Sequence, residues 1–236
     1  MIILGIDTAT AAASAALLED GKLISEATGG GDAIHRSNHA QNLLPLIDRL
    51  LDSAGVRLAD ISALAVAIGP GSFTGLRIGL STVKGLTYGS EVPVVGIPTL
   101  AAVAARVDDR EGLICPFLDA RKKEVYAALF ERRDGTLERV SEDLVCRPEE
   151  VVDFVRLKVA NGTCLFIGDA AAAYADAITQ GLGGRAVLTM GDRYPSTAAA
   201  VARLAEEKIR RQEYDPVGPL SPLYLRPSEA ELKRNP

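Results

Sequence analysis

The chain has 236 residues, of which 47% are hydrophobic and 24% charged, and its formal net charge is −5. This composition is ordinary for a globular protein with one large domain or two compact lobes. The negative charge argues against tight binding of DNA or RNA by the chain alone. Its apolar runs are far shorter than the ~18 residues of a membrane span. Three cysteines without C-x-x-C spacing, and no secretory signal pattern, lead us to expect a cytoplasmic protein.

Apolar runs and turn residues predict alternating strands and helices along the first part of the chain. We expect strands at 2–6, 13–18, 23–28, 63–68 and 94–97, and helices at 37–54, 74–88 and 99–106. A second, similar series has expected strands at 113–118, 124–130, 137–145, 164–167 and 186–188, and helices at 148–157, 170–178 and 196–211. The two series predict an α/β protein with lobes at residues 1–107 and 108–214 and an extended tail at 215–236.

The most informative segment is residues 69–79, GPGSFTGLRIG, which joins a predicted strand to a predicted helix. Such a turn presents free backbone N–H groups at a helix start, which suits an anion site, but its small residues equally suit close packing. No lysine follows the glycines as in a phosphate-binding P-loop, and the spacing around Ser72 differs from that of a nucleophile elbow. Gly75 and Gly79 lie one helical turn apart, so another segment can approach this helix closely.

Motifs spread in order from residue 2 to residue 226 resemble those of the bacterial TsaB (YeaZ) family. Besides segment 69–79, they are IDTA at 6–9, His39 ahead of LLP at 43–45, DAR at 119–121 with VY at 125–126, and PLYLR at 222–226. The resemblance implies a two-lobed fold of the actin/Hsp70/hexokinase (ASKHA) superfamily, each lobe a mixed β-sheet with helices. It also implies a role in making threonylcarbamoyladenosine at position 37 of tRNAs that read ANN codons.

In that family the catalytic subunit is the paralogue TsaD (Gcp), and the resemblance implies that this chain is its non-catalytic scaffold and activator. The implied partners are TsaD in a heterodimer and the ATPase TsaE, which binds the pair. Without TsaD, the chain is expected to self-associate into a homodimer through the same helices. Contact with tRNA is expected only through the complex, and contact with a membrane is not expected.

The residues at the expected metal-binding positions argue against a metal site in this chain. The catalytic relative has a His-x-Glu-Gly-His metal motif, and its register falls here on residues 99–103, TLAAV, which supply no metal donor. His35 and His39 have metal-like spacing but lack a third ligand. We therefore expect no metal site, and we interpret Asp7 as a loop anchor rather than a general base.

The turns that bind nucleotide phosphates in this fold lack most of their usual glycines here, which argues against nucleotide binding. Glycines are missing from the first hairpin at 7–10 and from the second-lobe hairpin at 119–121, and the turn at 168–171 keeps one glycine. We expect no cofactor and no catalytic residue. Two enzymatic alternatives stay open, an ATP-dependent small-molecule kinase of the same fold and a Gcp-type metallopeptidase.

The resemblance implies that helices 37–54 and 74–88 pair with TsaD. The apolar stripe of the first helix is wide enough to bury two sides, so Leu44, Ile47 and Leu51 are assigned to the core and the other side to a partner. The basic runs at 121–123 and 132–133 are interpreted as solvated turns. The expected interface residues are Leu46, Leu50, Gly71, Ser72, Thr74, Gly75, Arg77, Ile78, Gly79 and Val83.

Overall fold

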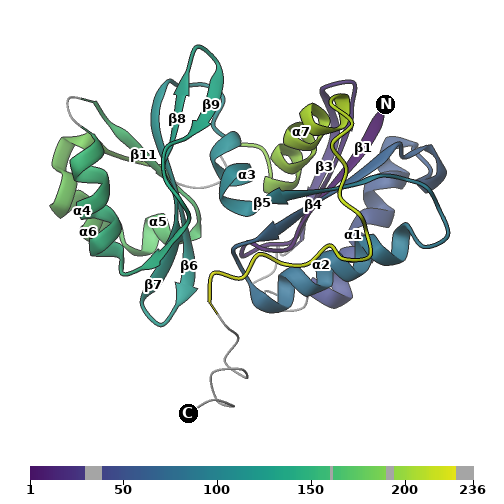
Figure 1. Ribbon diagram of the computed structural model, residues 1–236, viewed down its shortest axis with the longest axis horizontal. Helices are drawn as coiled ribbons and strands as arrows, with labels where there is room; N and C mark the ends of the chain where they lie inside the picture. The colour runs from purple at the N-terminus through teal and green to yellow at the C-terminus, as the bar shows by residue number, and fades with distance from the viewer. Residues whose placement is uncertain (30–38, 160–161, 190–193, 227–236) are drawn as a thin grey trace. The chain divides into compact units, whose positions relative to one another are not determined.

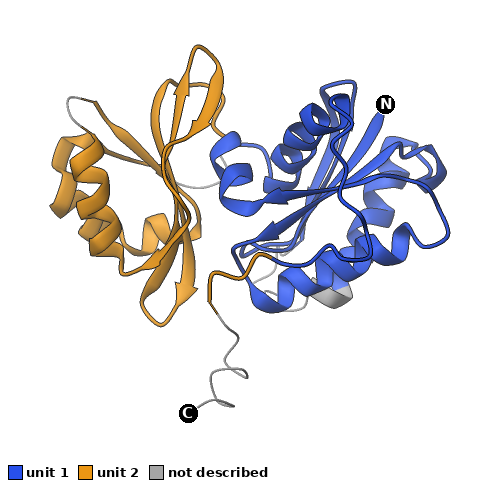
Figure 2. Cartoon of the chain, viewed as in Figure 1, with its two compact units in different colours: residues 1–106, 194–222 blue, residues 107–193, 223–236 orange. Residues whose placement is uncertain are grey.

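The computed structural model describes residues 1–29, 39–159, 162–189 and 194–226, with the side chains of 39–41 excepted. The chain forms two compact units, unit 1 from residues 1–106 and 194–222 and unit 2 from residues 107–193 and 223–236 (Figure 2). Within the described ranges, none of the helices combines the length and apolar character needed to cross a membrane. His35 and the expected helix start at Ser37 lie outside the described residues.

Unit 1 is built on a five-stranded sheet with helices packed on it (Figure 1). The strand order is β3-β2-β1-β4-β5, with antiparallel pairs β3-β2 and β2-β1 and parallel pairs β1-β4 and β4-β5. The strands are β1 (Ile2–Asp7), β2 (Ser14–Glu19), β3 (Lys22–Thr28), β4 (Ala63–Gly69) and β5 (Val94–Pro98). The helices are α1 (His39–Ala54), the 3-10 turn η1 (Leu58–Asp60), α2 (Phe73–Leu86), α3 (Thr99–Ala105) and α7 (Thr197–Arg210).

Two apolar cores lie on opposite faces of this sheet, because side chains alternate along each strand. On one face, Leu4 and Ile6 of β1 pack with the apolar residues of α1 and α2. On the other face, Ile3 packs with the Ala-rich surfaces of α3 and α7. The element order expected for residues 1–106 is confirmed, although α2 spans 73–86 rather than 74–88.

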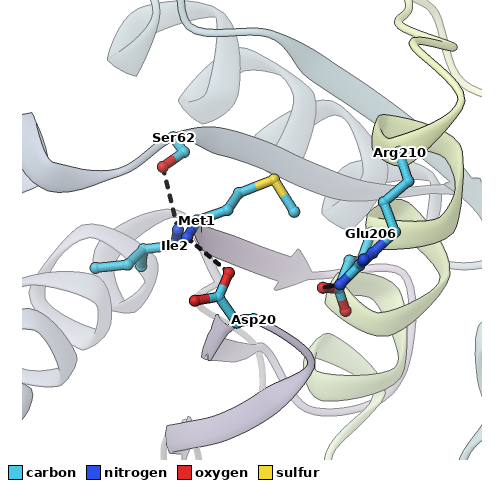
Figure 3. Close-up of polar contacts among 6 residues, drawn as sticks. All are labelled: Met1, Ile2, Asp20, Ser62, Glu206 and Arg210. Carbon is cyan, nitrogen blue, oxygen red and sulfur yellow. Dashed lines mark hydrogen bonds and ion pairs between the residues drawn. The ribbon is translucent and has the colours of Figure 1, made fainter.

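Strand β1 is held by polar contacts at its start (Figure 3). The Met1 ammonium pairs with the Asp20 carboxylate at 2.9 Å, and the N–H of Ile2 donates to Ser62 Oγ at 3.1 Å. Nearby on α7, the mostly buried Glu206 accepts a hydrogen bond from Arg210 at 2.8 Å. The first two contacts tie the start of β1 to the β2-β3 turn and to the segment before β4, and the third lies within α7.

Helix α7 packs on the unit 1 sheet, although the sequence analysis assigned its residues to the second lobe at 108–214. A Cβ on Gly5 of β1 would come within 2.3 Å of the Ala198 carbonyl oxygen, so only glycine allows this close packing. The N–H of Ala198 also donates to Ser14 Oγ at 3.2 Å. The expected division is therefore corrected, because residues 194–222 belong to unit 1.

The expected tail at 215–236 begins as an ordered strap along the edge of unit 1. The N–H of Asp215 donates to the Val94 carbonyl at 2.9 Å, and its carboxylate accepts the N–H of Gly96 at 2.7 Å. Lys84 Nζ donates to the carbonyl of Gly218 at 2.8 Å. The strap thus covers part of edge strand β5, while residues 227–236 lie outside the description.

Unit 2 contains a seven-stranded sheet with the order β10-β7-β6-β11-β12, and β8 and β9 branch from β6. Its core surrounds Phe117 and Phe166, whose rings meet edge-on at 5.5 Å. The strands are β6 (Gly112–Arg121), β7 (Glu124–Ala127), β8 (Phe130–Arg133), β9 (Thr136–Arg139), β10 (Leu144–Cys146), β11 (Cys164–Ile167) and β12 (Ala186–Leu188). The helices are α4 (Pro148–Lys158), α5 (Asp169–Ala173), α6 (Ala175–Leu182) and the 3-10 turn η2 (Gly183–Arg185).

Several expectations for unit 2 are wrong in detail. The strand expected at 137–145 is two strands, β9 and β10, and the strand expected at 124–130 covers β7 and the start of β8. The helix expected at 170–178 is two helices, α5 and α6. The basic run 132–133 belongs to strand β8, not to a turn, whereas 121–123 does form the exposed end of the β6-β7 hairpin. The merged strands arise because short strands separated by a few polar residues look continuous in a sequence pattern, and the basic run was assigned to a turn because it is charged.

Candidate functional site

The glycine-rich turn at 69–71 packs against the β1-β2 loop of unit 1. The Gly69-Pro70 peptide is cis, and the N–H of Gly69 donates to the Thr99 hydroxyl at 3.0 Å. The N–H of Ser72 donates to the Ala9 carbonyl at 2.8 Å, and Ser72 Oγ caps α2 by accepting the N–H of Gly75 at 3.2 Å. Several N–H groups that could have met an anion are thus satisfied within the protein.

Two glycines of α2, Gly75 and Gly79, are needed because Thr8 of the same unit packs closely against the helix. A Cβ on Gly75 would lie 1.8 Å from the Thr8 carbonyl oxygen, and one on Gly79 would lie 2.4 Å from Thr8 Oγ1. The Thr8 hydroxyl donates to the Gly75 carbonyl at 2.7 Å. The assignment of Gly75 and Gly79 to a partner interface is therefore corrected, because both face the chain's own β1-β2 loop.

Asp7 ends β1 and anchors this loop from a fully buried position. Its Oδ1 accepts the N–H of Ala9 at 2.8 Å, and its Oδ2 accepts the hydroxyl of Thr10 at 2.5 Å. Burial raises the pKa of Asp7 to about 6, although the hydrogen bonds from Thr10 and Ala9 and the charge of Arg106 lower it. These contacts are those of a loop anchor, as the sequence analysis interpreted Asp7.

The raised pKa of Asp7 predicts a pH-dependent stability difference for an Asp7→Asn variant. The folded protein binds this proton more tightly than the unfolded chain, so the stabilising contribution is complete below a pH of about 4 and is lost as pH rises through about 6. The pKa difference of about two units corresponds to about 3 kcal/mol at neutral pH. Because Asn keeps an acceptor for Ala9, the variant should be more stable than wild type by up to that amount at neutral pH.

Urea unfolding of both proteins near pH 4 and above pH 7 checks this expectation. The two free energies of unfolding should converge at the lower pH and separate at the higher pH. A stability difference that stays constant across this range would mean that Asp7 titrates with its ordinary pKa in the folded protein.

The positions aligned with the metal motif of the catalytic relative serve the packing of unit 1. The Thr99 hydroxyl accepts the Gly69 N–H, and Val103 is buried in the apolar core. In the part of the chain that the structure describes, no three His, Cys, Asp or Glu side chains are grouped to hold a metal ion.

In unit 2, the turns at 119–121 and 168–171 carry carboxylates that accept hydrogen bonds from nearby backbone N–H groups. Asp169 at the start of α5 accepts the N–H of Asp119 at 3.0 Å, and burial raises the pKa of Asp169. The Asp119 carboxylate in turn accepts the N–H of Arg121 at 2.8 Å. A Cβ on Gly168 would lie 2.3 Å from the Phe117 carbonyl oxygen, so this glycine also serves close packing.

The outward face of α1 and α2 differs from the one expected. Leu46, Leu50 and Val83 are at most 4% exposed and belong to the core of unit 1, so their assignment to an interface is wrong. Leu44, which was assigned to the core, is 53% exposed, whereas Ile47 and Leu51 are buried as expected. Among the other expected interface residues, the exposed ones are Ser72, Thr74 and Arg77, and the half-buried ones are Gly71 and Ile78.

An apolar groove of about 420 Å³ lies on this face, between α1, η1 and the end of α2. Leu44 and Leu58 expose 53% and 42% of their surface here, an unusual arrangement for two large aliphatic side chains in one hollow. Sequence reasoning missed Pro45, Asp48, Leu58 and Leu86 as part of a site. The lining residues are Leu44, Pro45, Ile47, Asp48, Leu51, Leu58 and Leu86.

The polar end of α2 adds a second exposed surface. The guanidinium of Arg77 lies 4.0 Å from the centre of the Phe73 ring, a cation–π contact at the first turns of the helix. Ser72 and Thr74 are exposed beside it. Together, the groove and this helix start form what we call the α1-α2 surface.

Comparison with known proteins identifies relatives along nearly the whole chain. Residues 27–233 match the family described as TsaD: tRNA N6-adenosine threonylcarbamoyltransferase. The tRNA threonylcarbamoyladenosine biosynthesis protein TsaB of Bacillus subtilis (strain 168) is 31% identical over 233 residues, covering 99% of this chain and 97% of that protein. The corresponding TsaB of Escherichia coli (strain K12) is 36% identical over 179 residues, covering 75% of this chain and 74% of that protein.

Solved structures agree with these sequence matches. YeaZ from Pseudomonas aeruginosa superposes with a TM-score of 0.78 at 29% identity, covering 95% of this chain and 99% of that one. A ROK hexokinase from Thermus thermophilus shares the fold alone, with a TM-score of 0.51 at 13% identity over 89% of this chain and 100% of that one. The two α/β units therefore have the same fold as these two structures, with a mixed sheet and helices in each unit. Among proteins with this fold, the chain belongs to the TsaB (YeaZ) family.

Proposed function

We propose that this chain is a non-catalytic scaffold subunit for threonylcarbamoyl transfer to adenosine 37 of ANN-decoding tRNAs. In this proposal it pairs with TsaD through the α1-α2 surface, activates that subunit and supports binding of the ATPase TsaE to the pair. The observation that carries the proposal is the apolar groove, in which the exposed Leu44 and Leu58 lie together with Pro45 and Leu86. Apolar side chains gathered in one exposed hollow are suited to contact with another protein.

The residues at the expected chemical positions support a non-catalytic role. Thr99 and Val103 have no metal-binding atoms of the usual kind, and each is used in packing. At the second-unit turn, the carboxylates of Asp119 and Asp169 would repel a nucleotide phosphate, and Asp169 already accepts the local N–H. Pairing therefore accounts for these observations better than a kinase or peptidase activity does.

Size-exclusion chromatography with light scattering tests the proposal on the full chain mixed with TsaD from the same organism. We expect a one-to-one species, and a homodimer when TsaD is left out. A chain that stays monomeric in excess TsaD would contradict the pairing. Calorimetry with ATP and magnesium on the chain alone addresses the kinase alternative, because tight binding there would contradict the non-catalytic role.

A further inference from the structure

Three hairpins of this protein share the same two-residue turn, but one of them has an unusual sequence. The β2-β3 turn is Asp20-Gly21 and the β8-β9 turn is Asp134-Gly135, and all four residues have positive φ. Asp-Gly is among the favoured pairs for such a turn, because both positions need the left-handed region. The β6-β7 turn also has positive φ at both positions, 55° and 62°, but its sequence is Lys122-Lys123.

The lysine pair has a higher conformational cost than the Asp-Gly pairs, because aspartate tolerates the left-handed region and glycine adopts it freely. Side chains with a Cβ are disfavoured in the left-handed region, where glycine is free. Arg121, the strand residue before the turn, also has a positive φ of 64°, so three successive cationic residues adopt this conformation. Backbone outliers of this kind persist where the surrounding structure holds them, and they are concentrated at functional sites.

The base of this hairpin is held by ion pairs and hydrogen bonds that engage its acidic groups. Arg226 pairs with Glu124 and donates to the Ala120 carbonyl at 2.9 Å. The Asp119 carboxylate lies 3.2 Å from the Arg121 guanidinium, whose side chain is 86% exposed. Figure 1 shows the β6-β7 hairpin. The residues at its end, 121–123, are cationic and exposed, and we call them the basic tip.

We propose that the basic tip is a contact site for the phosphate backbone of an RNA. The inference rests on the proposed function, in which tRNA is the substrate of the complex. A chain with a net charge of −5 would repel RNA over most of its surface, so its cations must be concentrated where such contact occurs. Lysine suits a phosphate as a point charge, and backbone contacts of this kind position an RNA without reading its sequence.

The test replaces the lysine pair with the sequence that the turn itself favours, Lys122→Asn with Lys123→Gly. This variant should melt at a higher temperature than wild type by a few degrees, because the turn strain is relieved. It should nevertheless bind RNA more weakly, so misfolding cannot account for the loss. The probe is an unmodified transcript of an ANN-reading tRNA, titrated with the full chain in complex with TsaD at several salt concentrations.

We expect the variant complex to lose at least about threefold in affinity near physiological salt. Its slope of log affinity against log salt should fall by about 1 to 2, as for one or two lost phosphate contacts. The control variant removes two exposed cations elsewhere, Lys22→Asn with Lys158→Asn, and should leave both quantities near wild type. Equal RNA affinity and slope for the tip variant and wild type would overturn the proposal, as would equal losses in the control.

Light scattering keeps this test separate from the proposed function. If the tip variant binds TsaD less tightly while RNA binding per complex is unchanged, the tip is a protein contact and the RNA proposal is overturned. If wild type forms no complex with TsaD, the proposed function fails. The same salt titration on the full chain alone then decides the role of the basic tip, by the same criteria for affinity and slope.

Discussion

A Gly75→Ala variant is expected to be less stable than the wild type by about 3 kcal/mol or more. The added methyl would lie 1.8 Å from the Thr8 carbonyl oxygen, which is part of the backbone at the end of the central strand β1. Neither β1 nor α2 can shift without disturbing the core that they share, since Thr8 is fully buried. Urea unfolding measures the loss of free energy, and thermal unfolding should show a fall in the melting temperature of about 10 °C.

Gly85, in the last turn of the same helix, provides the matched control. A Cβ at Gly85 would meet no atom within 4 Å. Gly85→Ala should therefore be neutral or stabilising by up to about 1 kcal/mol, because alanine has the higher helix propensity. Similar stabilities for the two alanine variants would mean that the close contact with Thr8 is not what requires glycine at position 75.

A Leu44→Glu variant is expected to lose pairing with TsaD while keeping its own fold. Leu44 is 53% exposed, so a charged side chain there remains in water in the unpaired chain. Within a pair, the same carboxylate would be buried in the apolar groove beside Asp48, which is unfavourable for two reasons, desolvation and like charge. We expect affinity to fall at least about tenfold by titration calorimetry, with an unchanged melting temperature.

Leu50→Ala separates this effect from damage to the core. Leu50 is 2% exposed and packs between α1 and the sheet, so truncation should cost about 2–5 kcal/mol of stability. Its effect on pairing should follow only from that lost stability. If Leu50→Ala abolished pairing in a chain that stayed folded, and Leu44→Glu did not, the paired face would be the one first expected from the sequence.

The fold of residues 1–106 could be predicted because its strands and helices carry clear periodicities and turn signals. The Asp20-Gly21 turn, the apolar run of β4 and the glycine after α1 each indicate one local structure. The place of α7 could not be predicted in this way. The alanines along one side of α7 indicate that this side packs closely on another element, but no local sequence signal tells which of the two sheets that element is.

Some residues of α1 and α2 were assigned to the wrong side of their helix, and these errors have a physical cause. The family resemblance, the wide apolar stripe of α1 and the glycines of α2 led us to expect that these helices pair with a partner, which stays a prediction. Periodicity alone does not tell which face is outward, so Leu44 and Leu46 were exchanged. Glycine spacing shows only that something approaches closely, and here Thr8 does so from the same chain.

The packing of α7 on β1 also affects the order in which this protein can be completed on the ribosome. Domains made of continuous segments usually fold N-terminal first, as soon as they leave the exit tunnel. Here the first strands are synthesised long before α7. This helix, residues 197–210, packs on one of the two apolar faces of their sheet. A nascent chain up to residue 193 contains most of unit 2, but it lacks residues 194–222 of unit 1 and with them α7. The N-terminal unit is therefore completed last, and until then the part of its sheet that α7 covers has no helix over it.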